Sequence, residues 1–468
     1  MRSVNLQFRP GKRTIETGVI VVAVLFGVRP PRLIAGTIGE GTPSPVQVGA
    51  NVHVSVDRHQ FPHDEVTIAA DPSDPSRLIA GSMTQSRPGA APEKSVAYAS
   101  FDGGKTWNLS RRHEGRPSDA VADPTVAYGP DGSAYFATIT WPDASKIGGE
   151  SLEIARSPDG GKTWGEARVI RVRADRPYIA IDCTGGQYRG RVYCSCKFDP
   201  GIGRFRPGLY IARDGRTFDE PRSWEVERPS VVLAMCNGVV LSDGTFALAY
   251  SLWAKREDDL KSGLFRVRLS VGLSPDGGET IRGAVASVGD FFWSNRSGVP
   301  MLAADVAGTR FQDSLYMVWA DARPGATRVL FAASRDKGST WSDPAIISEQ
   351  ERGKEFETFM PSVAVNREGI VGVSWYDRRG IPEKQAGWDV RFRASHDGGR
   401  TWATSVRVSE VSTLFTEDLL RKVPEEEERV GHTAGMAADA RGVFHPLWID
   451  NRTGVRQVWT AAVSVSSK

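Results

Sequence analysis

Residues 100–107 read Ser-Phe-Asp-Gly-Gly-Lys-Thr-Trp, and this octet recurs at a nearly constant interval along the 468-residue chain. Strong copies follow at residues 157–164, 334–341 and 395–402, and weaker ones lie at 213–218 and 274–281. The aspartates of the six copies stand at positions 102, 159, 214, 276, 336 and 397, so successive copies are 57, 55, 62, 60 and 61 residues apart. A near-fixed period of this size predicts a repeat architecture built from one supersecondary unit.

Each octet has the composition of a tight turn between two strands. Its Asp carboxylate can accept hydrogen bonds from the backbone N–H groups that follow it, and its Gly adopts a positive φ without steric penalty. Thr then resumes an extended chain, and Trp supplies a large apolar surface that packs against the sheet. Because the turn already engages the carboxylate, we expect a structural role for these aspartates rather than a catalytic one.

These octets resemble the Asp-box, or BNR repeat, of bacterial sialidases and related β-propellers. The resemblance covers nearly the whole chain after residue 45. It implies that the boxes lie at the outer edge of the blades, away from the ligand-binding face. It says little about function, because site chemistry varies independently on such folds.

A second repeat, in phase with the octets, pairs an apolar strand with another across a polar turn. Its seven copies lie at 66–71 with 78–83, 125–128 with 134–138, 178–182 with 191–198, 238–241 with 246–252, 301–305 with 315–319, 362–365 with 370–375, and 435–439 with 443–448. We therefore expect an all-β, seven-bladed propeller of four-stranded antiparallel blades. The chain ends one strand short, so residues 46–56 are predicted to supply that strand and close the ring. A six-bladed ring with an extra hairpin is the alternative, and sialidase catalytic domains have six blades.

The first residues have the pattern of an export signal. Arg2, Arg9, Lys12 and Arg13 precede an apolar run at 19–28, which is short for a bilayer span but suits a secretory signal. The predicted organisation is a signal peptide or N-terminal anchor at 1–35, a linker at 36–45 and the propeller at 46–468. We expect a secreted or periplasmic protein with no other membrane association.

The composition excludes some classes of partner. With 59 basic and 56 acidic residues the net charge is +3, and no basic stripe interleaved with aromatics is present. The chain therefore shows no bias toward nucleic acid.

The four cysteines suggest disulfides, because exported chains favour them over free thiols. Cys194 and Cys196 share one side of a strand. We predict the pairs Cys183–Cys194 and Cys196–Cys236. A metal site is the weaker alternative, because Cys-x-Cys lacks the two-residue gap typical of zinc knuckles.

Polar residues precede the first strand of most repeats, where side chains converge on the axial channel of a propeller. They are His63, Asp64, Glu65, Asp123, Asp175, Arg176, Asn237, Arg296, Glu357 and His432. Each alone is readily explained as a solvated loop residue or an ion pair between blades, whereas several in one cleft would form a functional site. An insertion at 411–431 precedes His432 and is interpreted either as a solvated acidic loop or as a lid.

Three repeats also carry a Trp and an Asp-x-Arg motif after their second strand, at 319–323, 375–379 and 448–452. The regular spacing favours structural ion pairs that hold loops on one face. Any arginine left unpaired there would bind a carboxylate in bidentate fashion.

The resemblance to sialidases implies an arginine triad for the sugar carboxylate, a Tyr nucleophile assisted by Glu, and an Asp acid/base. The catalytic candidates are Asp64 or Asp123 as the acid and Tyr376 with Glu357 as the nucleophile pair. The substrate-binding candidates are His63, Asp175, Arg176, Arg296 and His432. The family's Arg-Ile-Pro segment is absent from the first repeat, and Arg176-Pro177 in the third is its nearest echo. These assignments therefore rest on position relative to the strands.

Two functions fit these observations. The first is an exported, sialidase-like glycoside hydrolase acting on glycans with an acidic sugar, or, as a variant, a polysaccharide lyase with His63 or His432 as base. The second is a non-catalytic propeller that binds a glycan or a protein partner. In either case we expect a monomer that binds a glycan or acidic-sugar ligand and uses no metal and no cofactor.

Overall fold

The computed structural model describes residues 32–33, 45–85, 93–113, 116, 118–142, 149–199, 201, 205–224, 226, 231–253, 264–294, 297–323, 326–350, 355–382, 385–415 and 431–466. The chain divides into two compact units, Met1–Pro30 and Pro31–Lys468, and all the described residues belong to the second. The predicted signal peptide therefore falls outside the described residues, apart from Arg32–Leu33. No helix of the described part is both long and apolar enough to cross a membrane.

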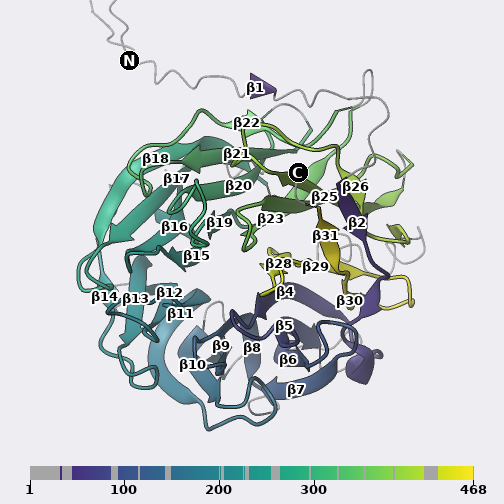
Figure 1. The fold of residues 1–468 in the computed structure, drawn as a ribbon. Helices are drawn as coiled ribbons and strands as arrows, with labels where there is room; N and C mark the ends of the chain where they lie inside the picture. Colours follow the sequence, from purple (N-terminus) through teal and green to yellow (C-terminus); the bar gives the residue numbers. More distant parts are fainter. Residues whose placement is uncertain are drawn as a thin grey trace, which may run out of the picture. The chain divides into compact units, whose positions relative to one another are not determined.

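The second unit is an all-β propeller whose sheets follow one another around a centre (Figure 1). The described residues contain no α-helix, and their one helical element is a 3₁₀ turn, η1 (Val56–Arg58). Apolar side chains from adjacent sheets fill the spaces between them, and the largest fully buried ones include Trp319, Trp375, Trp388 and Trp448. Burial of such large aromatic surfaces is the main force that holds neighbouring sheets together.

Hydrogen bonding groups the strands into six sheets. The first contains β4 (His63–Ala70), β5 (Leu78–Gln85), β6 (Glu93–Ser100) and β7 (Asn108–His113). The second contains β8 (Ala120–Tyr128), β9 (Ala134–Trp141), β10 (Gly149–Ser157), β11 (Arg168–Ile181), β12 (Val192–Asp199), β13 (Arg206–Ala212) and β14 (Arg222–Ser223). The third contains β15 (Val231–Val240), β16 (Phe246–Trp253), β17 (Phe265–Ser274) and β18 (Arg282–Trp293).

The other three sheets have the same antiparallel core with added short strands. The fourth contains β19 (Met301–Ala304), β20 (Leu315–Asp321), β21 (Arg328–Ser334) and β22 (Ala345–Ile346), with β1 (Arg32–Leu33) parallel to β22. The fifth contains β23 (Thr358–Val365), β24 (Val371–Asp377), β25 (Ala386–Ser395), β26 (Val406–Arg407) and β27 (Thr413–Phe415). The sixth contains β28 (Gly435–Ala438), β29 (Phe444–Asp450), β30 (Gln457–Thr460), β31 (Val463–Val465), β2 (Val46–Val48) and β3 (Val52–His53).

The predicted count of seven separate four-stranded blades is wrong, and the six-bladed alternative does not describe the sheets either. Five sheets have four to six strands, but the sheet of β8 to β14 has seven. The reason is β11, whose residues Arg168–Ala174 pair with β10 while Arg173–Ile181 pair with β12. No turn residue interrupts the Val- and Arg-rich start of this strand, so the chain passes from one repeat into the next without leaving the sheet.

The N-terminal segment joins the C-terminal sheet. β2 pairs antiparallel with β31, with Val46 opposite Val465 and Val48 opposite Val463. β3 pairs with β30, with Val52 opposite Thr460. The residues predicted to complete the last repeat therefore do hydrogen-bond to it.

The octets form the turns that their sequence predicts. In the first copy Asp102 Oδ1 accepts hydrogen bonds from the backbone N–H groups of Lys105 (3.0 Å) and Thr106 (2.9 Å), and Oδ2 accepts one from the Thr106 hydroxyl (2.6 Å). The Ser100 hydroxyl donates to Asp102 Oδ1 and accepts from Gly104 N–H. The hydrogen bonds from the Ser and Thr hydroxyls to the carboxylate recur around Asp159, Asp276, Asp336 and Asp397. These carboxylates are structural, as expected.

The predicted disulfides are absent, and all four cysteines are free thiols. The register explains this: Cys194 lies opposite Ile179 on β11, whereas Cys183 comes after that strand has ended and its thiol donates to Tyr128 O. Cys196 lies opposite Gly208 on β13 and Cys236 is buried within β15. Burial raises the pKa of Cys183 and Cys194 to about 12, so these thiols are unreactive.

Candidate functional site

Five of the strands nearest the centre of the propeller (Figure 1), which we call the inner strands, each contain a β-bulge. In β4, β8, β11, β15 and β23 two residues face a single residue of the next strand. The first bulge residue is Glu65, Asp123, Arg176, Cys236 and Met360, respectively. In three cases the second is proline (Pro124, Pro177 and Pro361), which lacks the N–H that a regular ladder needs and so favours a bulge.

Four of these bulge residues have left-handed backbone conformations. The φ values are +47° for Glu65, +54° for Asp123, +53° for Arg176 and +51° for Met360. Such conformations cost on the order of 1–3 kcal/mol each for residues other than glycine, and they concentrate at functional sites. At a bulge the side chain departs from the regular alternation of the strand. In β4, β8 and β11 that side chain is ionisable.

The three ionisable bulge residues, Glu65, Asp123 and Arg176, lie in one group with Asp175 and His432, and we call this group the axial cluster. His432 Nδ1 lies 2.8 Å from Glu65 Oε1. The Arg176 backbone N–H donates to Asp123 Oδ2 at 2.9 Å, and the side chains of Asp123 and Glu65 also share a hydrogen bond. Lys197 on β12 pairs with Asp175 at 2.6 Å. Three inner strands and the segment before β28 thus contribute to a single polar network.

The network separates the proton affinities of its two central carboxyls. Burial raises the pKa of Asp123 well above its usual range, and the charges of Glu65 and Asp175 raise it further. Burial acts in the same direction on Glu65, but the hydrogen bond and charge of His432, together with the charge of Arg176, outweigh it and lower its pKa to about 2. Asp123 therefore binds its proton more tightly than Glu65 does.

The remaining carboxyl of the cluster is also ionised. Burial raises the pKa of Asp175, but the charges of Lys197 and Arg176 lower it by more, so the net shift is downward. The described residues contain no group of three or more His, Cys, Asp or Glu side chains placed to hold a metal ion.

The position of His432 is set by its neighbours. Its carbonyl accepts a hydrogen bond from Val299 N–H (2.8 Å), and its ring lies 6.3 Å from that of Trp293, nearly parallel to it. Gly431, with φ +78°, brings the chain against Glu65, where a β-carbon would overlap the Glu65 side chain. His432 nevertheless keeps 34% of its side-chain surface exposed, so solvent reaches the cluster.

Four of the nine predicted site residues come together here: Asp123, Asp175, Arg176 and His432. Glu65 is one of the polar residues that precede the first strands in the sequence, but it was not among the predicted catalytic or substrate-binding residues. For Asp123 and Arg176 the sequence does carry a signal: each is followed by a proline directly before a predicted strand, and proline is typical of a bulge. Lys197 and Trp293 carry no comparable mark in the sequence.

Two predicted residues lie on β4 but outside the cluster. His63 is fully buried, its Nε2 lies 2.7 Å from the Tyr98 hydroxyl, and burial lowers its pKa to about 3. It is a neutral core residue and cannot contact a substrate. Asp64 precedes the bulge and lies 3.7 Å from Arg456.

The predicted nucleophile pair of Tyr376 and Glu357 is not supported. Tyr376 is 1% exposed, its ring stacks on Trp388 at 5.3 Å, and its hydroxyl accepts a hydrogen bond from Ile449 N–H. Burial also raises its pKa. On β24 the side chain at position 376 faces the core, so a tyrosine nucleophile at this position is excluded. The Glu357 carbonyl accepts from Arg378 N–H at the start of β23.

Other sequence predictions have mixed outcomes. The Asp-x-Arg motifs form structural ion pairs, with Arg379 3.2 Å from Asp377 and Arg452 2.6 Å from Asp450, as expected. The Asn237 side chain donates a hydrogen bond to Leu302 O and accepts one from Leu302 N–H, and so links β15 to β19. Arg296 and residues 416–430 of the proposed lid lie outside the described residues.

Comparison with known proteins agrees with this architecture. Residues 98–109 match the family model described as the BNR/Asp-box repeat. A solved protein of unknown function from Dyadobacter fermentans is 13% identical over 90% of this chain and 100% of its own, with a TM-score of 0.50. The chain is thus a β-propeller that carries a BNR/Asp-box repeat. At this identity the likeness concerns the fold alone.

Other solved structures resemble the Asp-box propeller more loosely. The Hadza microbial sialidase Hz136 is 15% identical over 93% of this chain and 98% of its own (TM-score 0.47). An α-L-arabinofuranosidase from Fusarium graminearum is 14% identical over 78% of this chain and 99% of its own (TM-score 0.47). A search of curated protein sequences finds no significant match.

Proposed function

We propose that the Asp-box propeller is an exported, monomeric glycoside hydrolase that acts on glycans containing an acidic sugar. In this proposal Asp123 is the general acid and Glu65 is the ionised carboxylate beside it. The observation that supports it most directly is the separation of their pKa values within one hydrogen-bonded group. Two carboxyls with opposite protonation states are what acid–base hydrolysis of a glycosidic bond requires.

The chemistry follows from the hydrogen bond between the two carboxyls. In the free protein Asp123 shares its proton with Glu65. A bound glycosidic oxygen would replace Glu65 as the acceptor and take that proton as the C–O bond breaks. Water would then add its oxygen to the anomeric carbon and give a proton to Glu65. This assignment takes the place of the predicted Tyr376–Glu357 pair.

The charge of the cluster is compatible with an anionic sugar. With the proton on Asp123, as the proposal requires, Arg176 and Lys197 balance the charges of Glu65 and Asp175. The Arg176 guanidinium and the Lys197 ammonium are the groups that would bind a sugar carboxylate.

A non-catalytic binding propeller is the second candidate. It is favoured by the ion pair of Lys197 with Asp175, by the carboxyl groups whose charges act on the buried Arg176, and by the burial of Tyr376. In that case the same cluster would recognise a glycan without cleaving it.

The decisive experiment is hydrolysis of fluorogenic sialosides, glucuronides and arabinofuranosides by the full-length protein. Asp123→Asn and Glu65→Gln should each lower kcat by a factor on the order of 10²–10⁴. Lys105→Ala, in an exposed Asp-box turn, serves as the control and should leave kcat unchanged. Absence of turnover on every substrate, combined with glycan binding that Arg176→Ala abolishes, would replace the hydrolase with the binding propeller.

Two structural expectations accompany this function. We propose that residues 1–35 direct export and 36–45 link them to the propeller, because basic residues precede the apolar run at 19–28. We also propose that the β2–β31 pairing closes the ring. Deleting residues 1–50 should then lower Tm by several degrees. Deleting residues 1–44 leaves β2 in place and should not change Tm. Equal Tm values for the two deletions would contradict closure of the ring by β2.

A further inference from the structure

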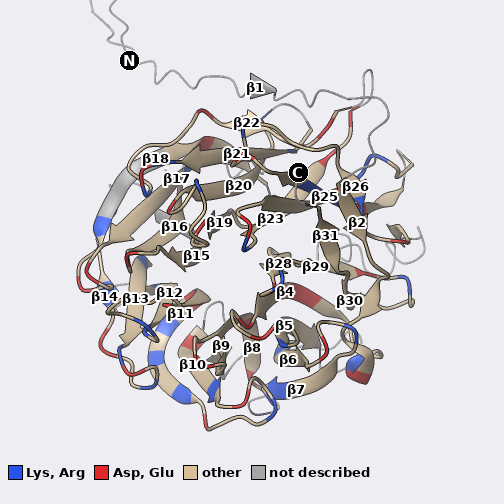
Figure 2. Ribbon diagram, in the orientation of Figure 1, with Lys and Arg blue, Asp and Glu red and all other residues tan. Residues whose placement is uncertain are grey.

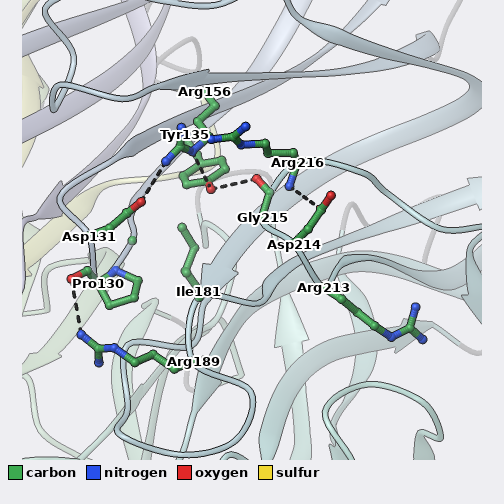
Figure 3. Close-up of a pocket in the computed structure, with 12 residues that line it drawn as sticks. Pro130, Asp131, Tyr135, Arg156, Ile181, Arg189, Arg213, Asp214, Gly215 and Arg216 are labelled. Atoms are coloured by element: carbon green, nitrogen blue, oxygen red, sulfur yellow. Dashed lines mark hydrogen bonds and ion pairs between the residues drawn. The ribbon is translucent and has the colours of Figure 1, made fainter.

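A second polar site lies away from the axial cluster, in a cavity of about 580 Å³ (Figure 3). We call it the arginine pocket, after Arg156, Arg189, Arg213 and Arg216, which line it together with Asp131 and Asp214. Its walls come from the turn between β8 and β9, the turn between β11 and β12, and the degenerate octet at 213–218. The volume lies within the range typical of small-ligand sites.

The arginine pocket has an excess of positive charge. Four guanidinium groups face two carboxylates among its lining residues. Arg156 pairs with Asp131 at 2.8 Å, and Arg213 pairs with Asp219 and Glu279, which lie outside the lining. Asp214 is occupied by the backbone N–H groups of Arg216 and Thr217.

Two of the arginines lack an acidic partner. Arg189 donates to three carbonyl oxygens, those of Cys183, Thr184 and Pro130, and these leave its charge uncompensated. Within the described part of the chain, the Arg216 guanidinium has neither a hydrogen bond nor an ion pair. Figure 3 shows the side chains of Arg216 and Arg156 extending toward each other beside Tyr135. Two like charges held near each other favour an anion between them.

The pocket is also preorganised. The Tyr135 hydroxyl accepts from Arg156 Nε at 3.1 Å and donates to Gly215 O at 2.9 Å. Gly215 has φ +69°, and a β-carbon there would lie 2.9 Å from that hydroxyl, so glycine keeps this hydrogen bond possible. Arg156 is therefore fixed before any ligand arrives, which lowers the entropic cost of binding.

The arginine pocket lies at the opposite end of the inner strands from the axial cluster. Asp123 stands near the start of β8, and the turn after that strand begins with Gly129, six residues later. At about 3.3 Å per residue the two positions are roughly 20 Å apart along the strand. The same ligand group cannot contact both sites.

We propose that the arginine pocket is a second ligand site that binds the anionic group, carboxylate or sulfate, of an acidic saccharide. The forked guanidinium groups match both anions, and the cavity is larger than an inorganic ion needs. This site holds no acid–base pair, so its role is binding. The inference is independent of whether the axial cluster catalyses hydrolysis.

Isothermal titration of the full-length protein with trigalacturonate, a chondroitin sulfate tetrasaccharide and neutral cellotriose tests the proposal. We expect binding of at least one anionic probe and none of cellotriose. Arg216→Ala should weaken that binding about 10- to 100-fold, because it removes a charged hydrogen-bond donor. Arg400→Ala is the matched control: it occupies the same position in another octet, and its backbone N–H likewise donates to the octet aspartate.

Three results would overturn the proposal. One is the failure of both anionic probes to bind at millimolar concentration. Another is equal affinity in the Arg216→Ala and Arg400→Ala variants. The third is loss of binding in Arg176→Ala with retention in Arg216→Ala, which would place the ligand at the axial cluster. Arg189→Ala provides a second variant of the pocket should Arg216→Ala fold poorly.

Discussion

Replacing Gly431 with alanine should separate His432 from Glu65 and thereby disrupt the axial cluster. Gly431 has φ +78°, and a β-carbon at this position would overlap Glu65 Cγ. It would also lie 2.8 Å from Glu65 N and 3.0 Å from Glu65 Cα. Rotation of the Glu65 side chain relieves only the first of these contacts, so the backbone at the bulge must move.

The expected magnitude has three parts. A left-handed conformation costs alanine about 1 kcal/mol relative to glycine. Displacing the packed backbone adds about 1–3 kcal/mol. Loss of the Glu65–His432 hydrogen bond adds about 1 kcal/mol. Together these lower the free energy of unfolding by about 3–5 kcal/mol.

Gly454 offers a matched control, because its φ is +85° and a β-carbon there would meet nothing within 4 Å. Gly454→Ala therefore carries the conformational cost alone, about 1 kcal/mol. Urea unfolding followed by tryptophan fluorescence measures both variants. Equal losses of stability would refute the reasoning, since they would show that the chain at Gly431 is not pressed against Glu65. Hydrolysis or glycan binding should fall only in Gly431→Ala.

Three further predictions concern the octets and the cysteines. Asp397→Ala removes four hydrogen bonds, so the free energy of unfolding measured in urea should fall by about 4 kcal/mol. Asp214→Ala removes two hydrogen bonds and should lower it by about 2 kcal/mol. Equal losses would contradict the view that the number of hydrogen bonds sets the loss of stability. Burial acts to raise the pKa of Asp159, but hydrogen bonds from Thr163, Ser157 and Lys162 lower it to about 2, below its unfolded value near 3.9. The stabilising contribution of Asp159 should therefore be complete above about pH 4 and be lost as pH falls through 2. Over this range the urea midpoint of the Asp159→Asn variant should depend less on pH than that of the unmodified protein. Dithiothreitol should leave Tm unchanged, because all four cysteines are free thiols, whereas a marked decrease would reveal a disulfide.

The octet turns were predictable because the hydrogen bonds of their aspartates are local. Asp102 bonds to residues no more than four positions away, so the spacing alone determines the turn. The Trp-x-Asp-x-Arg motifs were predictable for the same reason. Pairing between strands is different, because one register shift changes which side chains are opposed. The disulfide predictions were wrong because they assumed strand pairings whose register the sequence does not determine.

The axial cluster could be predicted from the sequence only in part. Its members were expected just before the first strand of their repeats. The structure places Asp123 near the start of β8, Asp175 and Arg176 in the middle of β11, and His432 in the segment before β28. Their roles depend on bulges, on burial and on contacts such as Glu65 with His432, which are 367 residues apart. Tyr376 illustrates the limit: alternation along β24 places its side chain in the core, and the sequence pattern of a fully buried strand does not show which face is which.

The unbroken course of β11 changes how the molecule divides into parts. Propellers are often treated as strings of exchangeable modules, each of which folds and is replaced as a unit. Here a cut between the second and third repeats would sever one continuous strand and detach Arg176 from residues that pair with β10. These two repeats should therefore exchange their amide protons and unfold together, and grafting or circular permutation should be tolerated at an octet turn but not within Arg168–Ile181.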